Sequence, residues 1–282
     1  MRYVIEADGH HLDLLSRTHI MGILNITPDS FSDGGLYLDT EKAVEHALRL
    51  ADDGADIIDI GGESTRPYSQ RVPLEEELKR VIPVIEGIRR YSDIPISIDT
   101  YKAEVAKRAI DAGASIVNDI TALRGDPLMA EVVRDRQVPL VLMHMKGDPS
   151  NMQDNPTYDN LMQEISLFLK ERAQYAISRG ISEEKVIVDP GIGFGKTFEH
   201  NLEIINRLGI LQELGYPILI GTSRKRFLGE ILNKEPMERD IGTMATVTAA
   251  ILNGANIVRV HNVKMAKDVV KVADALKKSL SK

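Results

Sequence analysis

The sequence predicts an α/β fold: a single-domain (β/α)8 barrel, or TIM barrel, with a short N-terminal β-hairpin. Three observations support this prediction. Short runs rich in Ile and Val recur at a spacing of roughly thirty residues, helical patterns separate these runs, and glycines stand where helices give way to strands. Because eight such runs alternate with helices, the barrel is favoured over a doubly wound open sheet, which fits fewer strands better.

The expected strands are near-continuous apolar runs, which indicates burial on both faces, as in a parallel sheet. They cover residues 20–26, 56–60, 94–99, 115–118, 139–144, 186–189, 217–221 and 257–261. Helical patterns between them include residues 40–53, 74–90 and 102–112, and the longest covers 158–178. Gly54, Gly113 and Gly254 each follow a helix, where a left-handed residue is needed before the next strand.

The first residues predict a small antiparallel hairpin ahead of the barrel, because residues 2–15 carry a turn signal at Asp8-Gly9. No linker, low-complexity tract or block of like charge divides the chain. We therefore expect one domain over residues 1–282, in which residues 1–18 form a hairpin cap.

Composition excludes several classes of function. The chain has 35 Lys and Arg against 42 Asp and Glu, a formal charge of −7, which argues against a general nucleic-acid coat. It has no Cys, so disulfides, thiolate zinc sites, cysteine nucleophiles and iron–sulfur clusters are excluded. No run approaches the ~18 apolar residues of a membrane helix, and the N-terminal residues lack a signal-peptide core. We expect a cytoplasmic protein without nucleic-acid or membrane partners.

Polar or charged side chains stand at nearly every expected strand end, where a barrel gathers its chemistry. They are Asn25, Asp59, Asp99, Asn118, His144, Asp189, Thr222, Ser223, Arg259 and His261. Helix capping explains single Asp or Asn residues at such places. It is a poor explanation for four residues that fall within the strand runs: Asp59, Asp99, Asn118 and Arg259.

The chemical groups of these side chains indicate what kind of ligand the site binds. Two carboxylates and an amide can bind the donor edge of a heterocycle, while Lys225, Arg259 and His261 follow the last two strands, where barrels commonly hold phosphate. We therefore expect a flat polar heterocycle that carries a phosphate or pyrophosphate.

Two long loops, residues 27–39 and 61–73, follow the first two strands directly. Loops of this length in a compact domain are usually functional lids or solvated surface segments. We favour lids because both loops begin at strand ends and carry reactive or aromatic side chains, among them Phe31, Ser64, Thr65 and Arg66.

Other readings of the motifs are weaker. Residues 190–197 end in Gly-Lys-Thr and nearly match the nucleotide P-loop, but Pro190 stands where that pattern needs Gly. The seven His residues form no His-Glu-x-x-His zinc pair, and Ser223 has no Gly-x-Ser-x-Gly elbow. His144 fits either a pocket residue or a hydrogen-bonded core histidine, and we favour the latter.

Several long motifs in order make the chain resemble the dihydropteroate synthases over essentially its whole length. They are GILNITPDSFSDGG at 22–35, GGESTRP at 61–67, SIDT at 97–100, VND at 117–119, DPGIGFGKT from 189, GTSRKRFLG from 221 and RVH at 259–261. The resemblance implies a (β/α)8 barrel, usually a homodimer, that condenses 6-hydroxymethyl-7,8-dihydropterin pyrophosphate with 4-aminobenzoate. It also implies a role in folate synthesis, a need for Mg²⁺, and sensitivity of the family to sulfonamides.

The resemblance also implies roles for individual residues. The pterin would be held by Asp99, Asn118, Asp189 and Lys225. The pyrophosphate would be bound by Asn25, Arg259 and His261, with Asn25 also near the Mg²⁺. The aminobenzoate side would be formed by Phe31, Thr65, Arg66, Pro67 and Phe194. Within this set the catalytic roles would belong to Asp99, Lys225 and Arg66.

Two positions depart from the family pattern, and two rival functions stay open. Tyr68 follows Pro67 where many members have Gly, and Arg226 follows Lys225 where some have Ser, which puts a side-chain contact to the aminobenzoate carboxylate in doubt. One rival is a pterin-binding methyltransferase barrel that uses methyltetrahydrofolate. The other is a non-catalytic paralogue that binds pterin as a sensor.

Overall fold

The computed structural model describes residues 3–7, 9–26, 35–64, 71–147, 152 and 154–280. Eight parallel strands form its central sheet: β3 His19–Asn25, β4 Ile57–Gly61, β5 Ile96–Asp99, β6 Ile116–Asp119, β7 Leu140–Met143, β8 Val186–Asp189, β9 Leu219–Ile220 and β10 Ile257–Val260. Their order is β8-β7-β6-β5-β4-β3-β10-β9, and a parallel bridge between Val188 and Ile218 joins the two ends. The strands therefore close into the expected (β/α)8 barrel.

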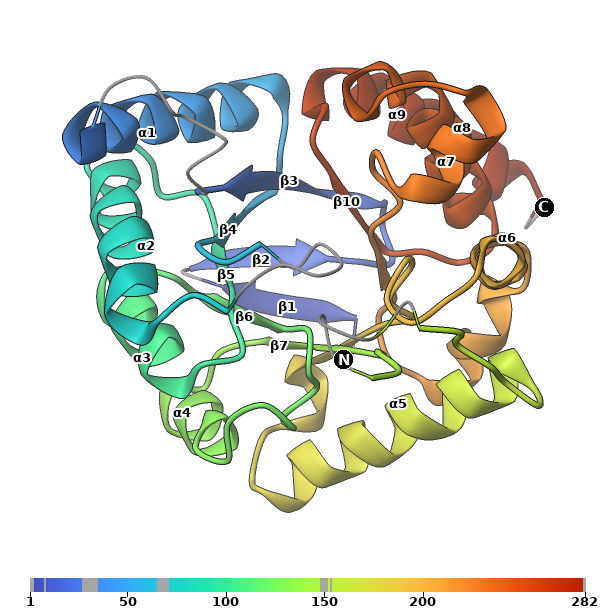
Figure 1. Ribbon diagram of the computed structural model, residues 1–282, viewed down its shortest axis with the longest axis horizontal. Helices are drawn as coiled ribbons and strands as arrows, with labels where there is room; N and C mark the ends of the chain where they lie inside the picture. Colours follow the sequence, from blue (N-terminus) through green and yellow to red (C-terminus); the bar gives the residue numbers. More distant parts are fainter. Residues whose placement is uncertain are drawn as a thin grey trace.

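Helices ring this barrel (Figure 1). They are α1 Gly35–Asp53, α2 Leu74–Arg89, α3 Ala103–Asp111, α4 Met129–Arg136, α5 Leu161–Ser178, α6 Phe198–Asn206, α7 Arg226–Leu232, α8 Asp240–Leu252 and α9 Val263–Leu280. Short 3-10 helices lie at η2 Glu183–Lys185, η3 Leu208–Leu214 and η4 Pro236–Glu238. None of the helices in the described ranges is long and apolar enough to cross a membrane.

The helix-to-strand joins confirm the expected use of glycine. Gly54, Gly113 and Gly254 have φ of 108°, 118° and 108°, a backbone region that residues with a Cβ rarely adopt. Each glycine lets the chain leave its helix and enter the next barrel strand within a few residues.

Two predicted helix boundaries were wrong. Helix α5 begins at Leu161, not at residue 158, because the side chain of Asn160 caps it by accepting from the backbone N–H of Gln163. The Tyr158 hydroxyl donates to the carbonyl of Gly195 instead, at 2.7 Å. Helix α1 begins at Gly35, so residues 35–39 of the predicted first loop are helical.

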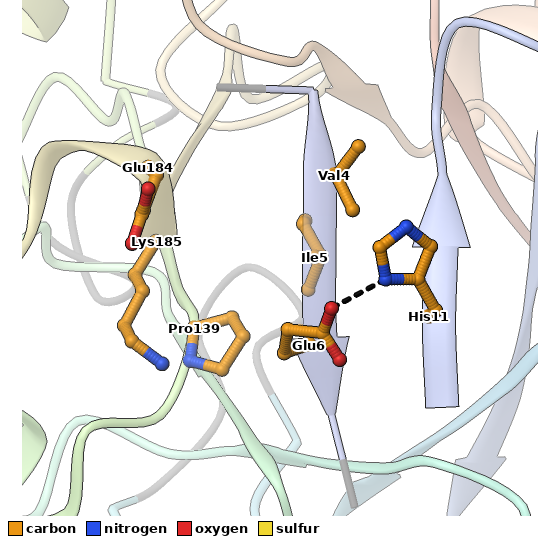
Figure 2. Close-up of a pocket in the computed structure, with 7 residues that line it drawn as sticks. All are labelled: Val4, Ile5, Glu6, His11, Pro139, Glu184 and Lys185. Carbon is orange, nitrogen blue, oxygen red and sulfur yellow. Dashed lines mark hydrogen bonds and ion pairs between the residues drawn. The ribbon is translucent and has the colours of Figure 1, made fainter. Parts of the chain in front are cut away.

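An antiparallel hairpin, β1 Val4–Ala7 and β2 His10–Asp13, covers the N-terminal end of the barrel. Its buried side chains join an apolar cluster with residues from seven barrel strands: Ile5, Ala7, Leu12 and Leu14 with Met21, Ile57, Ile116, Val141, Ile187, Leu219 and Ile257. A surface hollow of about 420 Å³ lies beside the hairpin, lined by Val4, Ile5, Glu6, His11, Pro139, Glu184 and Lys185 (Figure 2). A larger apolar cluster fills the space between the strands and the helices.

Candidate active site

A buried polar network joins the C-terminal ends of β4, β5, β6 and β10. Arg259 Nε lies 2.5 Å from Asp59 Oδ2, and Arg259 Nη2 lies 2.8 Å from Asp99 Oδ2. The Asn118 amide donates to the same Asp59 oxygen at 3.2 Å. Parallel pairing sets Asp99 level with Gly61 on β4 and with Asn118 on β6, so the strand register itself brings these groups together.

Two buried carboxyl groups at this end of the barrel, Asp99 and Asp189, have raised pKa values. Burial raises the pKa of Asp99 to about 7; Arg259 opposes the rise, and Asp59 and Glu77 add to it. Burial likewise raises the pKa of Asp189, at the end of β8, to about 6, while the backbone N–H of Gly191 lowers it through a 2.6 Å hydrogen bond. A ligand that binds beside either group can therefore change its protonation state near neutral pH, which is typical of carboxyl groups that act in binding or catalysis.

Lys225 and Phe194, from the loops that follow β9 and β8, face each other. Lys225 immediately precedes α7, and its Nζ lies 4.3 Å from the centre of the Phe194 ring. Burial and the charge of Arg259 lower the pKa of Lys225 to about 8. Phe194 belongs to a small apolar cluster with Ile120, Met143, Met145 and Met152. The arrangement places a cation on an aromatic face next to an apolar wall.

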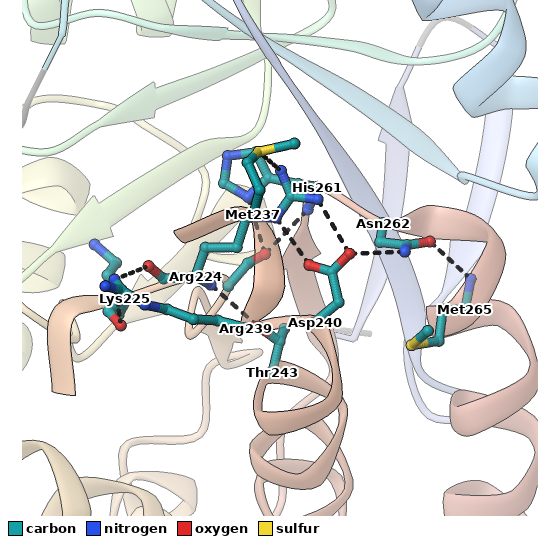
Figure 3. Close-up of polar contacts among 10 residues, drawn as sticks. Arg224, Lys225, Met237, Arg239, Asp240, Thr243, His261, Asn262 and Met265 are labelled. Atoms are coloured by element: carbon teal, nitrogen blue, oxygen red, sulfur yellow. Dashed lines mark hydrogen bonds and ion pairs between the residues drawn. The ribbon is translucent and has the colours of Figure 1, made fainter. Parts of the chain in front are cut away.

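A brace outside the barrel holds the loops that follow β9 and β10 (Figure 3). Asp240, the first residue of α8, accepts from Arg224 Nε at 2.8 Å and from the Asn262 amide at 2.8 Å. Arg224 has a φ of 57°, and its backbone N–H donates to Thr243 Oγ1 at 3.1 Å. Because Arg224 and Asn262 adjoin Lys225 and His261 in the chain, this brace fixes the positions of both site residues.

His261 is a hydrogen-bonding group in the free protein. Its Nδ1 lies 2.9 Å from Ser223 Oγ, and its backbone N–H donates to the same oxygen at 3.2 Å. Burial lowers its pKa to about 3, with Arg224 and Arg259 acting in the same direction. The low pKa leaves His261 uncharged near neutral pH, so that Lys225 and Arg259 supply the positive charge among these three residues.

Asn25, at the end of β3, lies beside Asp99. A methyl group at Gly61 would be 3.6 Å from Asn25 Oδ1 and 3.7 Å from Asp99 Oδ2, so these two oxygens flank one glycine. Amide and carboxylate oxygens are hard donors of the kind that Mg²⁺ prefers. Within the described ranges, no group of three or more His, Asp or Glu residues could hold a metal. The donors present fit an ion that takes most of its ligands from phosphate and water.

The base of the second long loop is fixed by a cluster around Lys102. Its Nζ lies 2.5 Å from Glu63 Oε2 and also contacts Glu77, which is buried and accepts from Thr100 Oγ1 at 2.8 Å. Tyr101 donates to Glu63 at 3.1 Å. This cluster ties the segment after β4 to the segment after β5, directly beyond Asp99.

Several predicted site residues fall outside the described ranges: Phe31, Thr65, Arg66 and Pro67, together with Tyr68. The side chain of Arg226 is exposed and lies 2.9 Å from Glu230 one helical turn away. The structure brings the other predicted residues together at one end of the barrel: Asn25, Asp99, Asn118, Asp189, Phe194, Lys225, Arg259 and His261.

Two residues of this region had no assigned role in the sequence. Asp59 had been noted at a strand end, but the structure makes it the shared acceptor of Arg259 and Asn118, fully buried. A charged residue inside a buried apolar run was the signal that could have identified it. Asp240 gives no comparable signal, because Asp at a helix start is ordinary. His144 is buried and hydrogen-bonded, as expected for a core histidine.

Comparison with other proteins agrees with this geometry. The family model described as pterin binding enzyme matches residues 21–261. The dihydropteroate synthase of Bacillus subtilis is 49% identical over 273 residues, covering 97% of this chain and 93% of that protein. That of Escherichia coli is 44% identical over 269 residues, covering 95% of each.

Solved structures give the same result. A Yersinia pestis dihydropteroate synthase in complex with a sulfonamide drug has a TM-score of 0.92 and 42% identity, covering 98% of this chain and 99% of that one. A Xanthomonas albilineans dihydropteroate synthase in complex with 7,8-dihydropteroate has a TM-score of 0.88 and 44% identity, covering 97% and 98%. This chain therefore belongs to the dihydropteroate synthase family of pterin-binding enzymes, transferases of folate biosynthesis.

Proposed function

We propose that the chain, acting as one domain over residues 1–282 with residues 1–18 as its cap, makes 7,8-dihydropteroate. It condenses 6-hydroxymethyl-7,8-dihydropterin pyrophosphate with 4-aminobenzoate and releases pyrophosphate. The observation that carries this proposal is the buried contact of Arg259 with Asp59 and Asp99 beside Asn118. This contact places a cation next to hydrogen-bond acceptors at the C-terminal end of the barrel. Relatives from Xanthomonas albilineans have been solved with 4-aminobenzoate and with 7,8-dihydropteroate.

The pterin is held by Asp99, Asn118, Asp189 and Lys225. The 2-amino and ring N–H groups of a pterin form a donor edge, which a buried carboxylate accepts strongly because the hydrogen bonds are charge-assisted. Asp189, enclosed and already bonded to one backbone N–H, has lone pairs left for that edge. The amide of Asn118 and the ammonium of Lys225 serve the remaining ring acceptors.

The pyrophosphate is bound by Arg259, His261 and Asn25. Arg259 supplies the charge, and His261 with its partner Ser223 supplies hydrogen bonds. We infer that the pyrophosphate binds together with a divalent cation. We propose Mg²⁺, held by Asn25 Oδ1 and by substrate oxygens; when bound, it stabilises negative charge on the leaving pyrophosphate.

The reaction begins when the bond between the pterin methylene carbon and the pyrophosphate oxygen breaks, and both electrons leave with the oxygen. The methylene carbon becomes cationic, and the Asp99 carboxylate stabilises that charge as it develops. The neutral amine of 4-aminobenzoate then attacks the carbon, a C–N bond forms, and the amine proton passes to water. Lys225 keeps the pterin oriented throughout this step.

The aminobenzoate binds on the side of Phe194, against residues of the two front loops. Phe31, Thr65, Arg66 and Pro67 complete this side, with Arg66 acting as a catalytic group that orients the amine. The cluster around Lys102 supports this assignment, because it anchors the segment that leads into residues 65–67 next to Asp99.

A homodimer is the proposed assembly. Exposed large apolar side chains occur on α7, α8 and α9, which lie side by side in Figure 1, and on η4, which joins α7 to α8: Ile231, Leu232, Met237, Ile241, Leu252, Met265, Val272 and Leu276. A second copy would cover this face. Light scattering should give the mass of two chains, and Ile241→Glu should give one, whereas Leu15→Glu on the hairpin should change nothing.

The expected location, the cytoplasm, stays a prediction that cell fractionation can test.

One incubation tests the function. Purified protein with Mg²⁺ and the dihydropterin pyrophosphate should form 7,8-dihydropteroate only when 4-aminobenzoate is present, and a chelator should stop the reaction until Mg²⁺ is restored. Methyl transfer from methyltetrahydrofolate without dihydropteroate would instead establish the methyltransferase. Tight pterin binding without any product would establish the non-catalytic paralogue.

A further inference from the structure

Lys196 is a buried lysine that the proposed reaction does not use. It stands in the Gly-Lys-Thr run that resembles a nucleotide P-loop, where the lysine would point at phosphate. In this protein it is only 2% exposed. Its Nζ donates to the carbonyl of Phe194 at 2.9 Å and to that of His144 at 3.3 Å, and it lies 2.9 Å from His144 Nδ1. All the hydrogen-bonding capacity of its nitrogen is used inside the protein.

These contacts connect two separate segments at the C-terminal end of the barrel. His144 directly follows β7, whereas Phe194 and Lys196 lie in the loop after β8. The loop lies very close to the β7 segment: a Cβ at Gly191 would be 2.0 Å from the carbonyl oxygen of His144, and one at Gly195 would be 2.4 Å from that of Lys146. The two glycines therefore allow the loop after β8 to pack against the segment after β7, and Lys196 bonds the two segments together.

The loop that Lys196 fastens carries Phe194 of the aminobenzoate side and contacts two residues of the pterin pocket, Lys225 and Asp189. The ring of Phe194 lies under the ammonium of Lys225 at 4.3 Å. The backbone N–H of Gly191, at the start of the same loop, donates to Asp189 Oδ1. Asn201 at the start of α6 accepts from the N–H of Gly193 at 2.7 Å, so the far side of the loop is held as well.

We propose that Lys196 is a positioning residue for the pterin pocket: it fastens the loop after β8 to the end of β7, so that Phe194 lies correctly beneath Lys225. This inference rests on the proposed function. It gives the lysine of the P-loop-like run a role that involves no phosphate, because its nitrogen is enclosed by two carbonyl oxygens and an imidazole.

The arrangement does not depend on one protonation state. Burial lowers the pKa of Lys196 well below its ordinary value and that of His144 to about 2. An ammonium donates to all three partners. A neutral amine donates to the two carbonyls and accepts from an Nδ1–H of the imidazole, so the three contacts persist in either state.

Steady-state kinetics on Lys196→Met test the proposal. The substitution keeps the length of the side chain and removes its hydrogen bonds. We expect the KM for the dihydropterin pyrophosphate to rise about tenfold, because the released loop no longer holds Phe194 beneath Lys225 or the N–H of Gly191 against Asp189. The KM for 4-aminobenzoate should rise as well, because Phe194 also forms one side of the aminobenzoate site. Lys185→Met is the matched control, because its Nζ also donates to a carbonyl, that of Gln137, at the other end of the barrel; it should leave both values unchanged.

A double-mutant cycle separates positioning from general structural support. In a Phe194→Ala background, Lys196→Met should raise the pterin KM less than about twofold, because the residue through which it acts is gone. A second full tenfold rise would overturn the proposal. So would an unchanged pterin KM in the single variant while the wild-type enzyme makes dihydropteroate. If the wild-type enzyme makes none, the proposed function fails, and the inference falls with it.

Two variants of His144 decide the matter if Lys196→Met does not fold. His144→Asn retains an acceptor near the Nδ1 position, whereas His144→Leu removes it. We expect the pterin KM of the Leu variant to rise several-fold and that of the Asn variant to stay close to the wild-type value. Equal values for the two variants would overturn the proposal.

Discussion

The two ends of this barrel are built from the same eight strands and have opposite chemistry. At the N-terminal end, seven strands and the hairpin contribute only apolar side chains to one buried cluster. At the C-terminal end, Asp59, Asn118 and Asp189 are buried among charged partners, and Asp59 Oδ1 has no hydrogen-bond partner within the described ranges. Burying charge is costly even when it is paired. The difference indicates that one end stabilises the fold and the other gives up stability for function.

Asp99→Asn should give the largest functional effect at the polar end. We expect kcat to fall about 10²–10³-fold, because the charge that stabilises the cationic methylene is lost. At pH 5, where the Asp99 carboxyl is largely protonated, the free energy of unfolding should change by less than about 1 kcal/mol, because Asn is a neutral side chain of similar size and Asp59 still pairs with Arg259. Kinetics and urea unfolding measure the two quantities. If the free energy of unfolding fell by as much as the activation free energy of the reaction rose, this end of the barrel would have a structural role as well.

Ile5→Ala should give the largest stability effect at the apolar end. Ile5 is 1% exposed within the hairpin cluster, and truncation of a buried Ile costs about 2–4 kcal/mol. Urea unfolding should show this loss, while both KM values stay within about twofold of the wild type. Leu15→Ala, at a site that is 66% exposed, is the control and should cost less than about 0.5 kcal/mol. A large change in kcat for Ile5→Ala would show that the two ends are coupled.

The pH dependence of kcat/KM for the pterin substrate should follow the buried groups of the polar end. Activity should rise through pH 6 to 7 as Asp189 and Asp99 ionise, and fall above about pH 8 as Lys225 loses its proton. Asp189→Asn should remove the part of the rise in kcat/KM that occurs near pH 6. A profile without an acid limb would contradict the roles of both carboxylates.

The same shifts fix the sign of the stability effect. The pKa values of Asp99 and Asp189 lie above the ordinary carboxyl value, so the folded protein binds more protons than the unfolded chain between about pH 4 and 7. Their contribution to the free energy of unfolding is therefore fully present below pH 4 and is lost as the pH rises to 7. Urea unfolding of wild type and Asp99→Asn at pH 5 and 7 should show a smaller decrease for the variant.

His11→Ala should give the smallest effect. His11 contacts Glu6 on the exposed face of the hairpin, beside the hollow in Figure 2. Exposed pairs of this kind contribute between about 0 and 1 kcal/mol. Thermal unfolding should therefore place the variant within about 0.5 kcal/mol of the wild type, with unchanged kinetics. A loss above about 1.5 kcal/mol would mean that the apolar cluster does not account for the stability of this end.

Much of the fold could be predicted because the barrel strands are buried on both faces and therefore read as continuous apolar runs. Helix starts were harder to predict, as α5 shows. Tyr158 fits the apolar period of that helix, but its hydroxyl bonds to Gly195, a residue distant in sequence, and Asn160 then takes the capping position. The residues of the front loops that the resemblance assigned to aminobenzoate stay predictions.

The sequence by itself determined the strand positions, the glycine joins and the polar residues at the strand ends, because hydrophobic period and backbone φ are local properties of the chain. Only the tertiary structure decided which of these residues share a network. Asp59, Asn118 and Arg259 come from different strands, and their contacts depend on barrel closure and strand register. Lys196 shows the same limit: Pro190 argues against a phosphate-binding loop, but only the packing of the loop on the end of β7 shows what the lysine nitrogen contacts instead. The sequence motif gives the types of the side chains, and the packing of the folded chain determines which partners they contact.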